Sequence, residues 1–255
     1  MKGGVGKSTV TLGLAQALHR KGKRVGILDL DYRSPVIPLL MGADGASLGR
    51  TTEDALVPPV IDGISVMSMA FLWPDGKAVM VEDSLAVGDV RQILTPGVIA
   101  WPADLEYMVI DSPPSSSGIV LAILSLPEAS GAILVSHPST ASRAALLRTL
   151  DLFAEKQMPI YGLVCNQGRD EVTQMPRYDL TEADLQHLAE QFKMPLFMTI
   201  PHATRLNDYF DILGTAVLAA RPIILAPSPE PQGEKWQKIV ELARKLTQQS
   251  TSAAS

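Results

Sequence analysis

Short apolar runs alternate with segments of helical periodicity along most of this chain. The apolar runs are nearly continuous, which is typical of strands covered on both faces. They predict strands at Arg24–Leu30, Ile64–Met69, Tyr107–Asp111, Ala132–Ser136, Ile160–Asn166 and Leu196–Ile200. The segments between them predict helices at Ser8–Arg20, Asp83–Leu94, Ile119–Leu126, Ala141–Glu155, Thr181–Phe192 and Arg205–Leu213. This order predicts an α/β fold with a doubly wound, mainly parallel sheet and helices on both faces.

The C-terminal part of the chain has a different pattern. Four prolines within residues 221–233 predict an extended connector after a single domain that covers residues 1–220. The apolar positions that follow recur at helical spacing: Trp236, Ile239, Val240, Ala243 and Leu246. They predict an amphipathic helix over residues 234–249 that packs back on the domain, with a membrane or partner helix as the alternative. Residues 250–255 are predicted to form a tail.

Composition narrows the class of protein. The 255 residues are 46% hydrophobic, which predicts a globular domain with a large core rather than a disordered chain. The single cysteine, Cys165, cannot form an internal disulfide or supply a cysteine-rich metal site by itself. A net charge of −5 argues against a protein that mainly holds nucleic acid phosphates. The apolar runs fall short of the ~18 residues of a membrane span, and a cytoplasmic address is expected.

A glycine-rich segment near the start carries the most specific signal. Residues 2–9 read Lys-Gly-Gly-Val-Gly-Lys-Ser-Thr and lead directly into an apolar-periodic helix, as a P-loop does. The glycines let backbone N–H groups turn toward phosphate oxygens, and the helix N-terminus adds partial positive charge. We predict that Lys7 reaches the β- and γ-phosphates and that the Ser8 hydroxyl ligates Mg²⁺. The predicted nucleotide-binding residues of this loop are Gly3, Gly4, Val5, Gly6, Lys7, Ser8 and Thr9.

Acidic residues follow two of the predicted strands. Asp111 ends an apolar strand, at the sheet edge where α/β folds bind ligands, and is predicted to hold Mg²⁺ through water; helix capping is the alternative. Asp29 and Asp31 are two apart at the end of another strand, so both are expected to point to the same side. One would orient the attacking water and the other support the metal shell. For Asp31 the alternative is ordinary turn chemistry before Pro35.

Further segments carry a resemblance to a known family. Lys2, five residues before Lys7 and beside two glycines, matches the deviant Walker A pattern, and residues 29–38, 66–72, 104–114 and 131–135 agree with it. On these residues the chain resembles the ParA/MinD group of ATPases, and within it the Mrp-type ATP-binding proteins associated with iron–sulfur cluster delivery. The resemblance runs from Lys2 to about Gly214 and implies a Mg²⁺-dependent ATPase that forms a homodimer around ATP and uses hydrolysis to switch partner contacts. It does not identify the client protein.

The resemblance also implies roles for single residues. Lys2 would contact the phosphates held by the partner subunit of the homodimer, with a solvated, flexible chain end as the alternative. Asp31 would be the switch residue linked to hydrolysis. The implied catalytic set is Lys2, Lys7 and Asp31, and the implied metal set is Ser8, Asp29 and Asp111.

A second group of residues is assigned to the base of ATP. Asn166 ends a predicted strand, and its amide can both donate to and accept from the adenine edge. In the family an asparagine at this position recognises the base. Pro201 and His202, followed by Ala203, resemble the segment that flanks the adenine ring.

Three features depart from the family pattern. Residues 167–176 hold no cysteine where cluster-carrying members have a Cys-x-x-Cys pair, which argues against an iron–sulfur cluster of that type. Ser115-Ser116-Ser117-Gly118 replaces Gly-Thr-Gly-Asp, which predicts slow or differently triggered hydrolysis. Met1 stands where the first P-loop glycine belongs, so we expect the natural protein to carry a strand ahead of this loop.

Two other functions compete with the Mrp-type ATPase. One is a ParA/MinD-like positioning or partitioning ATPase whose ATP dimer binds DNA or a membrane surface, and the missing cysteine pair favours it. The other is an ATP sensor that does not hydrolyse its ligand. Net acidity and the resemblances at Ser-Pro-Pro and Phe71-Leu72-Trp73 favour the Mrp type.

Overall fold

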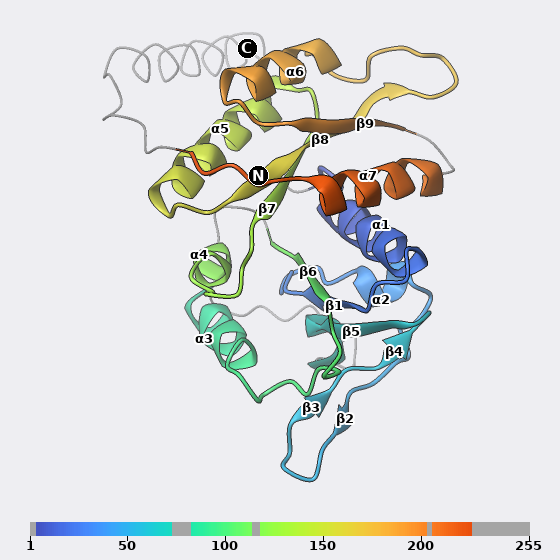
Figure 1. Cartoon of the computed structure of the whole chain (residues 1–255), viewed down its shortest axis with the longest axis vertical. Helices are drawn as coiled ribbons and strands as arrows, with labels where there is room; N and C mark the ends of the chain where they lie inside the picture. Colours follow the sequence, from blue (N-terminus) through green and yellow to red (C-terminus); the bar gives the residue numbers. More distant parts are fainter. Residues whose placement is uncertain (1–3, 73–82, 114–117, 203–205, 226–255) are drawn as a thin grey trace, which may run out of the picture.

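The computed structural model describes residues 4–72, 83–113, 118–202 and 206–225. Its strands form two main sheets (Figure 1). The first has the order β4-β5-β1-β6 and the second the order β7-β8-β9. Their bounds are β1 Val25–Asp29, β4 Val60–Ile61, β5 Ile64–Ser68, β6 Tyr107–Asp111, β7 Ala132–Ser136, β8 Ile160–Asp170 and β9 Leu196–His202. A separate two-stranded ribbon joins β2 Gly49–Arg50 and β3 Leu56–Val57.

Helices cover both faces of these sheets. They are α1 Lys7–Arg20, α2 Ile37–Leu40, α3 Asp83–Ile93, α4 Gly118–Leu124, α5 Thr140–Glu155, α6 Glu182–Gln191 and α7 Asn207–Ala219, with a short 3₁₀ turn at Met69–Leu72. The apolar sides of α1 and α7 pack against strands of both sheets in one core cluster. On the opposite faces, α3 and α4 cover the first sheet, and α5 and α6 cover the second. The predicted doubly wound α/β fold is therefore confirmed.

The sheets are parallel except at one edge. β1 pairs in parallel with β5 and β6, and β8 pairs in parallel with β7 and β9. β4 pairs antiparallel with β5 through a tight turn at Asp62 and Gly63, whose φ angles are 48° and 80°. Positive φ at both central positions is the hairpin geometry that an Asp-Gly pair favours. The sequence analysis missed this hairpin, together with β2, β3 and α2.

Several predicted boundaries are wrong, for local reasons. α7 continues to Ala219 instead of ending at Leu213. Its interior Gly214 lies against α1, where an added Cβ would be 3.0 Å from the Ala17 Cβ, so this glycine permits close helix packing rather than ending the helix. β8 runs past Asn166 to Asp170, and β9 runs past Ile200 to His202, since the two strands pair again at these ends after a bulge.

The described chain ends beside the second sheet. In the first part of the predicted connector, Ile223 exchanges two backbone hydrogen bonds of 2.8 Å with Ile160, the first residue of β8. The rest of the predicted connector, the helix predicted at 234–249 and the tail at 250–255 lie outside the described residues. No helix in the described ranges is long and apolar enough to cross a membrane.

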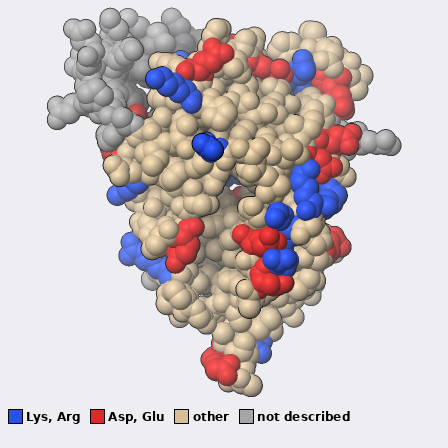
Figure 2. Space-filling model, in the orientation of Figure 1, with Lys and Arg blue, Asp and Glu red and all other residues tan. Residues whose placement is uncertain are grey.

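Charges of both signs are interspersed on the face drawn in Figure 2. Ion pairs join Arg20 to Asp211, between α1 and α7, and Lys23 and Arg24 to Glu106, ahead of β1 and β6. A surface that binds nucleic acid phosphates needs lysine and arginine side chains concentrated on one face. The face drawn in Figure 2 has no such arrangement among its described residues.

Candidate functional site

The P-loop backbone is bent by two glycines at the start of α1. Gly4 and Gly6 have φ angles of 83° and 89°, in the region that L side chains rarely adopt, and Val5 between them is buried. Gly6 is the N-cap of α1, which has no side-chain cap and no acidic residue in its first turn. The N–H groups of this turn are therefore available to an anion, and the helix dipole favours one there. Gly3 lies outside the described residues.

Asn166 fastens this loop to the second sheet. Its side-chain Nδ2 donates a 2.9 Å hydrogen bond to the backbone oxygen of Val5, and the residue is buried on β8. A Cβ added at Gly6 would be 2.1 Å from that same Nδ2. The glycine is thus required both by its backbone conformation and by the close approach of Asn166.

Replacing Gly6 with alanine is expected to destabilise the fold by about 2–3 kcal/mol, because the new methyl group adds a clash with Asn166 to the backbone strain. Gly22→Ala is the matched control, since Gly22 has a φ of 78° but nothing within 4 Å of its added Cβ. Gly22→Ala should lower the free energy of unfolding by only about 1 kcal/mol, because it adds backbone strain without a clash. Urea denaturation of both variants measures the difference. Equal losses would contradict the role given to the Asn166 contact.

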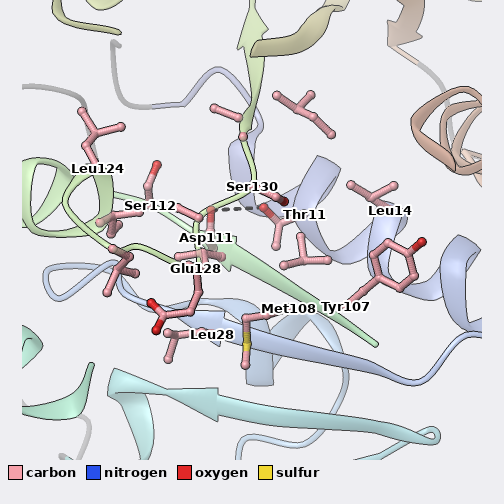
Figure 3. A pocket seen from close by; sticks show the side chains of 18 of the residues that line it. Thr11, Leu14, Leu28, Tyr107, Met108, Asp111, Ser112, Leu124, Glu128 and Ser130 are labelled. Atoms are coloured by element: carbon pink, nitrogen blue, oxygen red, sulfur yellow. Dashed lines mark hydrogen bonds between the residues drawn. The ribbon is translucent and has the colours of Figure 1, made fainter. Parts of the chain in front are cut away.

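Asp111 is the buried acid of this site, at the end of β6. It is 1% exposed, and its Oδ1 accepts a long hydrogen bond of 3.5 Å from the Thr11 hydroxyl on α1. Figure 3 shows the two side chains pointing toward one another. Its Oδ2 has no hydrogen-bond partner among the described residues. Burial raises the pKa of Asp111, while the Ser8 hydroxyl and the Lys7 charge lower it. A buried carboxylate oxygen without a partner, beside a serine hydroxyl and a phosphate loop, fits the ligand set of Mg²⁺.

Asp29 lies beside Asp111 on the neighbouring strand. The two are register partners of β1 and β6, and Asp29 is completely buried. Its Oδ2 accepts hydrogen bonds from the Ser68 hydroxyl at 2.8 Å and the Ile37 N–H at 3.3 Å, and its Oδ1 accepts from the Asp31 N–H at 3.2 Å. Burial, and then the Asp111 charge, raise the pKa of Asp29 to about 7. Asp29 therefore holds the loop after β1 against β5.

Protein without metal or nucleotide should lose stability as pH rises toward 7. The unfolded chain releases the Asp29 proton near the ordinary pKa of 3.8, whereas the folded chain keeps it until about 7. The folded state therefore binds this proton more tightly, and the contribution is largest below about pH 4 and lost by about pH 7.

Asn at position 29 has no proton to lose. From about pH 5 to about pH 8, the unfolding free energy of Asp29→Asn relative to the parent protein should rise by on the order of 2–3 kcal/mol. Chemical denaturation in EDTA at both pH values measures it. The exposed Asp44→Asn is the control, with little expected change. A difference that stays constant with pH would contradict the interpretation.

Asp31 lies at the same sheet edge, but on a loop and not on a strand as predicted. β1 ends at Asp29, so the expectation that both carboxylates share one side of a strand is wrong. Asp31 lies in the following loop, where its Oδ1 accepts hydrogen bonds of 3.3 Å from the N–H groups of Arg33 and Ser34. It is close enough to Asp111 for its charge to raise the pKa of that residue. The loop, not the strand, brings Asp31 to the site.

The residues assigned to adenine come together at the carboxyl ends of β8 and β9. Asn166 is the register partner of Ile200, and Pro201, which follows Ile200 on β9, is buried. The His202 side chain is half exposed, with its Nδ1 3.8 Å from Asp170 Oδ2. Their role toward a base stays a prediction.

The sequence analysis missed two residues whose hydroxyl groups contact the acidic residues of the site. Thr11 lies one helical turn after Lys7, and its spacing places it on the same face of α1. Ser68 ends β5, which pairs with β1, but strand pairing is not readable from one strand alone. Lys2, the serines at 115–117 and Ala203 lie outside the described residues.

The cysteine does not fit a metal-bound cluster. Cys165 is completely buried on β8, in the core between the second sheet and the helices α5 and α6. Burial raises the pKa of its thiol to about 12, and only the thiolate ligates metals well. In the described part of the chain, no three His, Cys, Asp or Glu side chains are grouped as metal ligands. The buried thiol of Cys165 is therefore not placed to ligate an iron–sulfur cluster.

A protein-family model and the curated proteins most similar to this chain indicate the same family. Residues 1–241 match the model of the ParA family, described as NUBPL iron-transfer P-loop NTPase. The chain is 30% identical over 210 residues to the "Iron-sulfur cluster carrier protein" of Rickettsia felis, across 82% of this chain and 62% of that protein. It is 37% identical over 171 residues to the protein of the same name from Methanocaldococcus jannaschii, across 66% of this chain and 57% of that protein. The chain thus spans about three fifths of the length of these relatives.

Solved structures show the same fold. A nucleotide-binding protein from Archaeoglobus fulgidus in complex with ADP is 31% identical, with a TM-score of 0.63 over 85% of this chain and 84% of that one. The cell division ATPase MinD of Pyrococcus furiosus has a TM-score of 0.55 at 20% identity, over 96% of this chain and 95% of that one. The second likeness supports the fold alone.

Proposed function

Because the chain belongs to the ParA family of NUBPL iron-transfer P-loop NTPases, we propose that it is a Mg²⁺-dependent ATPase that acts as a nucleotide-dependent dimeric switch. One observation carries the proposal. The buried, unpartnered Oδ2 of Asp111 lies at the same sheet edge as the uncapped N-terminus of α1, so an anion site and a cation site adjoin. A nucleotide phosphate with its metal ion is the ligand that satisfies both.

The residues of the P-loop bind and neutralise the phosphates. The N–H groups of Gly4, Val5 and Gly6 and of the first turn of α1, which includes Ser8 and Thr9, are proposed to surround the phosphate oxygens. Gly3 belongs to this proposed set on the sequence alone. Lys7 places its ammonium on the β- and γ-phosphates.

Ser8 and Asp111 hold Mg²⁺, and Asp29 supports the metal shell from the next strand. The metal supplies charge neutralisation at the phosphate oxygens when bound. Its usual site has one or two carboxylates, substrate phosphates and several waters, so it needs no larger cluster of acidic side chains.

The switch proposal concerns Asp31 and Lys2. Asp31 sits on a loop held by Asp29, close to Asp111, and from there its carboxylate can accept a hydrogen bond from the attacking water. Lys2 precedes the loop and is proposed to reach the phosphates of the partner subunit in a homodimer. A positive charge delivered in this way stabilises charge in the transition state. Asn166, Pro201 and His202 are proposed to hold the adenine that makes ATP the substrate.

We do not propose a bound iron–sulfur cluster for this chain, although its curated relatives are named for one. The curated relatives are called iron–sulfur cluster carrier proteins. Here Cys165 is in the core, and residues 167–176 hold no cysteine. We therefore assign this chain the nucleotide switch without a thiolate-bound cluster, with a client protein whose identity stays open.

Alanine at position 31 tests the catalytic assignment. Asp31→Ala should reduce ATP turnover by at least about tenfold while ATP affinity changes little, because a water-orienting base contributes about 10²–10⁴ to rate and not to ground-state binding. Phosphate release measures turnover, and a fluorescent ATP analogue measures affinity. Asp44→Ala, an exposed acid on a loop, is the matched control. Unchanged turnover would remove Asp31 from the mechanism, and absence of turnover in the parent chain would favour an ATP sensor.

A further inference from the structure

Tyr32, the residue after Asp31, is buried in the core between the first sheet and α3. It is 6% exposed and packs in the cluster that β1 and β5 form with this helix. Its hydroxyl donates a 3.0 Å hydrogen bond to Oδ2 of Asp89 on α3. Burial, and then this hydrogen bond, raise the pKa of Tyr32 to about 12, so the hydroxyl keeps its proton at neutral pH and remains a donor. The loop after β1 is therefore tied to α3 through a side-chain pair.

This tie lies next to the groups that orient the Asp31 carboxylate. On one side, the Asp31 N–H donates to Asp29 Oδ1, which fixes the loop to β1. On the other side, the N–H groups of Arg33 and Ser34, the two residues after Tyr32, donate to Asp31 Oδ1. Fixing Tyr32 therefore fixes the backbone that carries these two donors. The Asp31 carboxylate is held between an anchor on β1 and an anchor on α3.

The helix α3 is itself packed on two sides, which makes it a firm support. Its apolar residues Ala86 and Val90 share the core cluster with β1 and β5 and with Ile119 of α4. Figure 1 shows α3 and α4 side by side. A Cβ added at Gly118, where α4 begins, would be only 2.7 Å from a methyl carbon of Val87, so the two helices approach closely. Asp89 thus presents its carboxylate from a fixed position.

We propose that Tyr32 and Asp89 are positioning residues for Asp31. The hydrogen bond between them fixes the loop to α3, and the loop then keeps the Asp31 carboxylate in the orientation that accepts a hydrogen bond from the attacking water. The buried ring supplies packing, and the hydroxyl supplies the direction, because a hydrogen bond to a carboxylate is strong and directional. This inference rests on the proposed ATPase for its effect on turnover, and on the contact with Asp89 for its effect on the loop.

Three variants of the chain test the contact. Tyr32→Phe removes the hydroxyl, Asp89→Ala removes the acceptor, and Asp89→Asn keeps an acceptor oxygen. Tyr32→Phe and Asp89→Ala should each lower kcat for ATP by about five- to tenfold while KM changes by less than about twofold, since one hydrogen bond that orients a reacting group is lost. The double variant should lose no more than either single variant, because both remove the same contact. Asp89→Asn should keep kcat within about twofold of the parent value.

A second readout needs no turnover. Amide exchange over residues 31–37, measured without nucleotide or metal, should be faster by at least about threefold in Tyr32→Phe and Asp89→Ala, because the loop opens more often. It should stay close to the parent rate in Asp89→Asn. Tyr161→Phe is the matched control, since Tyr161 lies at the amino end of β8, away from the site, and its loss of a hydroxyl should change neither readout.

Three results would overturn the proposal. Exchange over residues 31–37 could be the same in all variants, which would mean that the contact does not fix the loop. Asp89→Asn could lose as much kcat as Asp89→Ala, so that the hydrogen bond is not what matters. KM could rise as much as kcat falls, which is the sign of a role in binding. Absence of turnover in the parent chain would remove the proposed ATPase, and exchange would still decide whether Tyr32 and Asp89 hold the loop.

Discussion

Lys7→Ala is expected to weaken ATP binding by at least about 100-fold, because the variant removes the cation that meets the β- and γ-phosphates. Lys7 is the first residue of α1, and its charge already lowers the pKa of Asp111 in the protein without ligand. Removing one partner of a charged pair in a shielded site costs several kcal/mol, which corresponds to this loss of affinity. Titration with a fluorescent ATP analogue in the presence of Mg²⁺ measures it.

Lys21→Ala is the matched control for that variant. Lys21 is an exposed lysine at the other end of the same helix, so its loss removes an equal charge far from the phosphates. ATP affinity should stay within about twofold of the parent value, since exposed charges at this distance are screened by salt. A loss of affinity as large as that of Lys7→Ala would show that net charge, and not the P-loop contact, governs binding.

The sequence predicted the fold well because the alternation of apolar runs and helical periodicity is strong along the chain. Nearly continuous apolar runs such as Tyr107–Asp111 and Ala132–Ser136 have the same bounds in the structure as in the prediction. The helix starts at 7 and 140 differ by one residue from those predicted. The boundaries that were predicted wrongly depend on tertiary contacts, which the local sequence pattern does not show. The helix predicted at Arg205–Leu213 continues to Ala219, and its Gly214 packs closely against Ala17 of α1.

Part of the candidate site could be placed from the sequence: Gly4, Gly6, Lys7, Ser8, Asp29 and Asp111 lie together at one sheet edge. Their roles toward a nucleotide and a metal ion stay predictions. The contact between Asn166 and Val5 joins residues 161 positions apart and has no local signal. The burial that raises the pKa of Asp29 to about 7 likewise depends on the strands on either side of it.

Asp111→Asn should abolish the dependence of phosphate release on Mg²⁺ and reduce turnover by at least about 100-fold. The substitution keeps the shape of the side chain and its oxygen toward Thr11, but replaces the unpartnered Oδ2 with an amide nitrogen that cannot ligate a cation. Affinity for ATP in EDTA should stay the same, because the P-loop amides and Lys7 are intact. Phosphate release against Mg²⁺ concentration measures the first effect, and analogue titration in EDTA measures the second.

The same substitution should not destabilise the folded protein. A loss of turnover in this variant therefore reports on the reaction and not on unfolding. Burial raises the pKa of Asp111, so its ionised form destabilises the folded state at neutral pH. It also adds to the repulsion that raises the pKa of Asp29. A neutral amide removes both costs, so Asp111→Asn should denature at the same or a higher urea concentration than the parent chain. Asp104→Asn, in an exposed ion pair with Arg24 ahead of the same strand, is the control and should leave turnover unchanged. If Asp111→Asn keeps full Mg²⁺ dependence, the metal is held elsewhere and the ligand assignment of Asp111 is wrong.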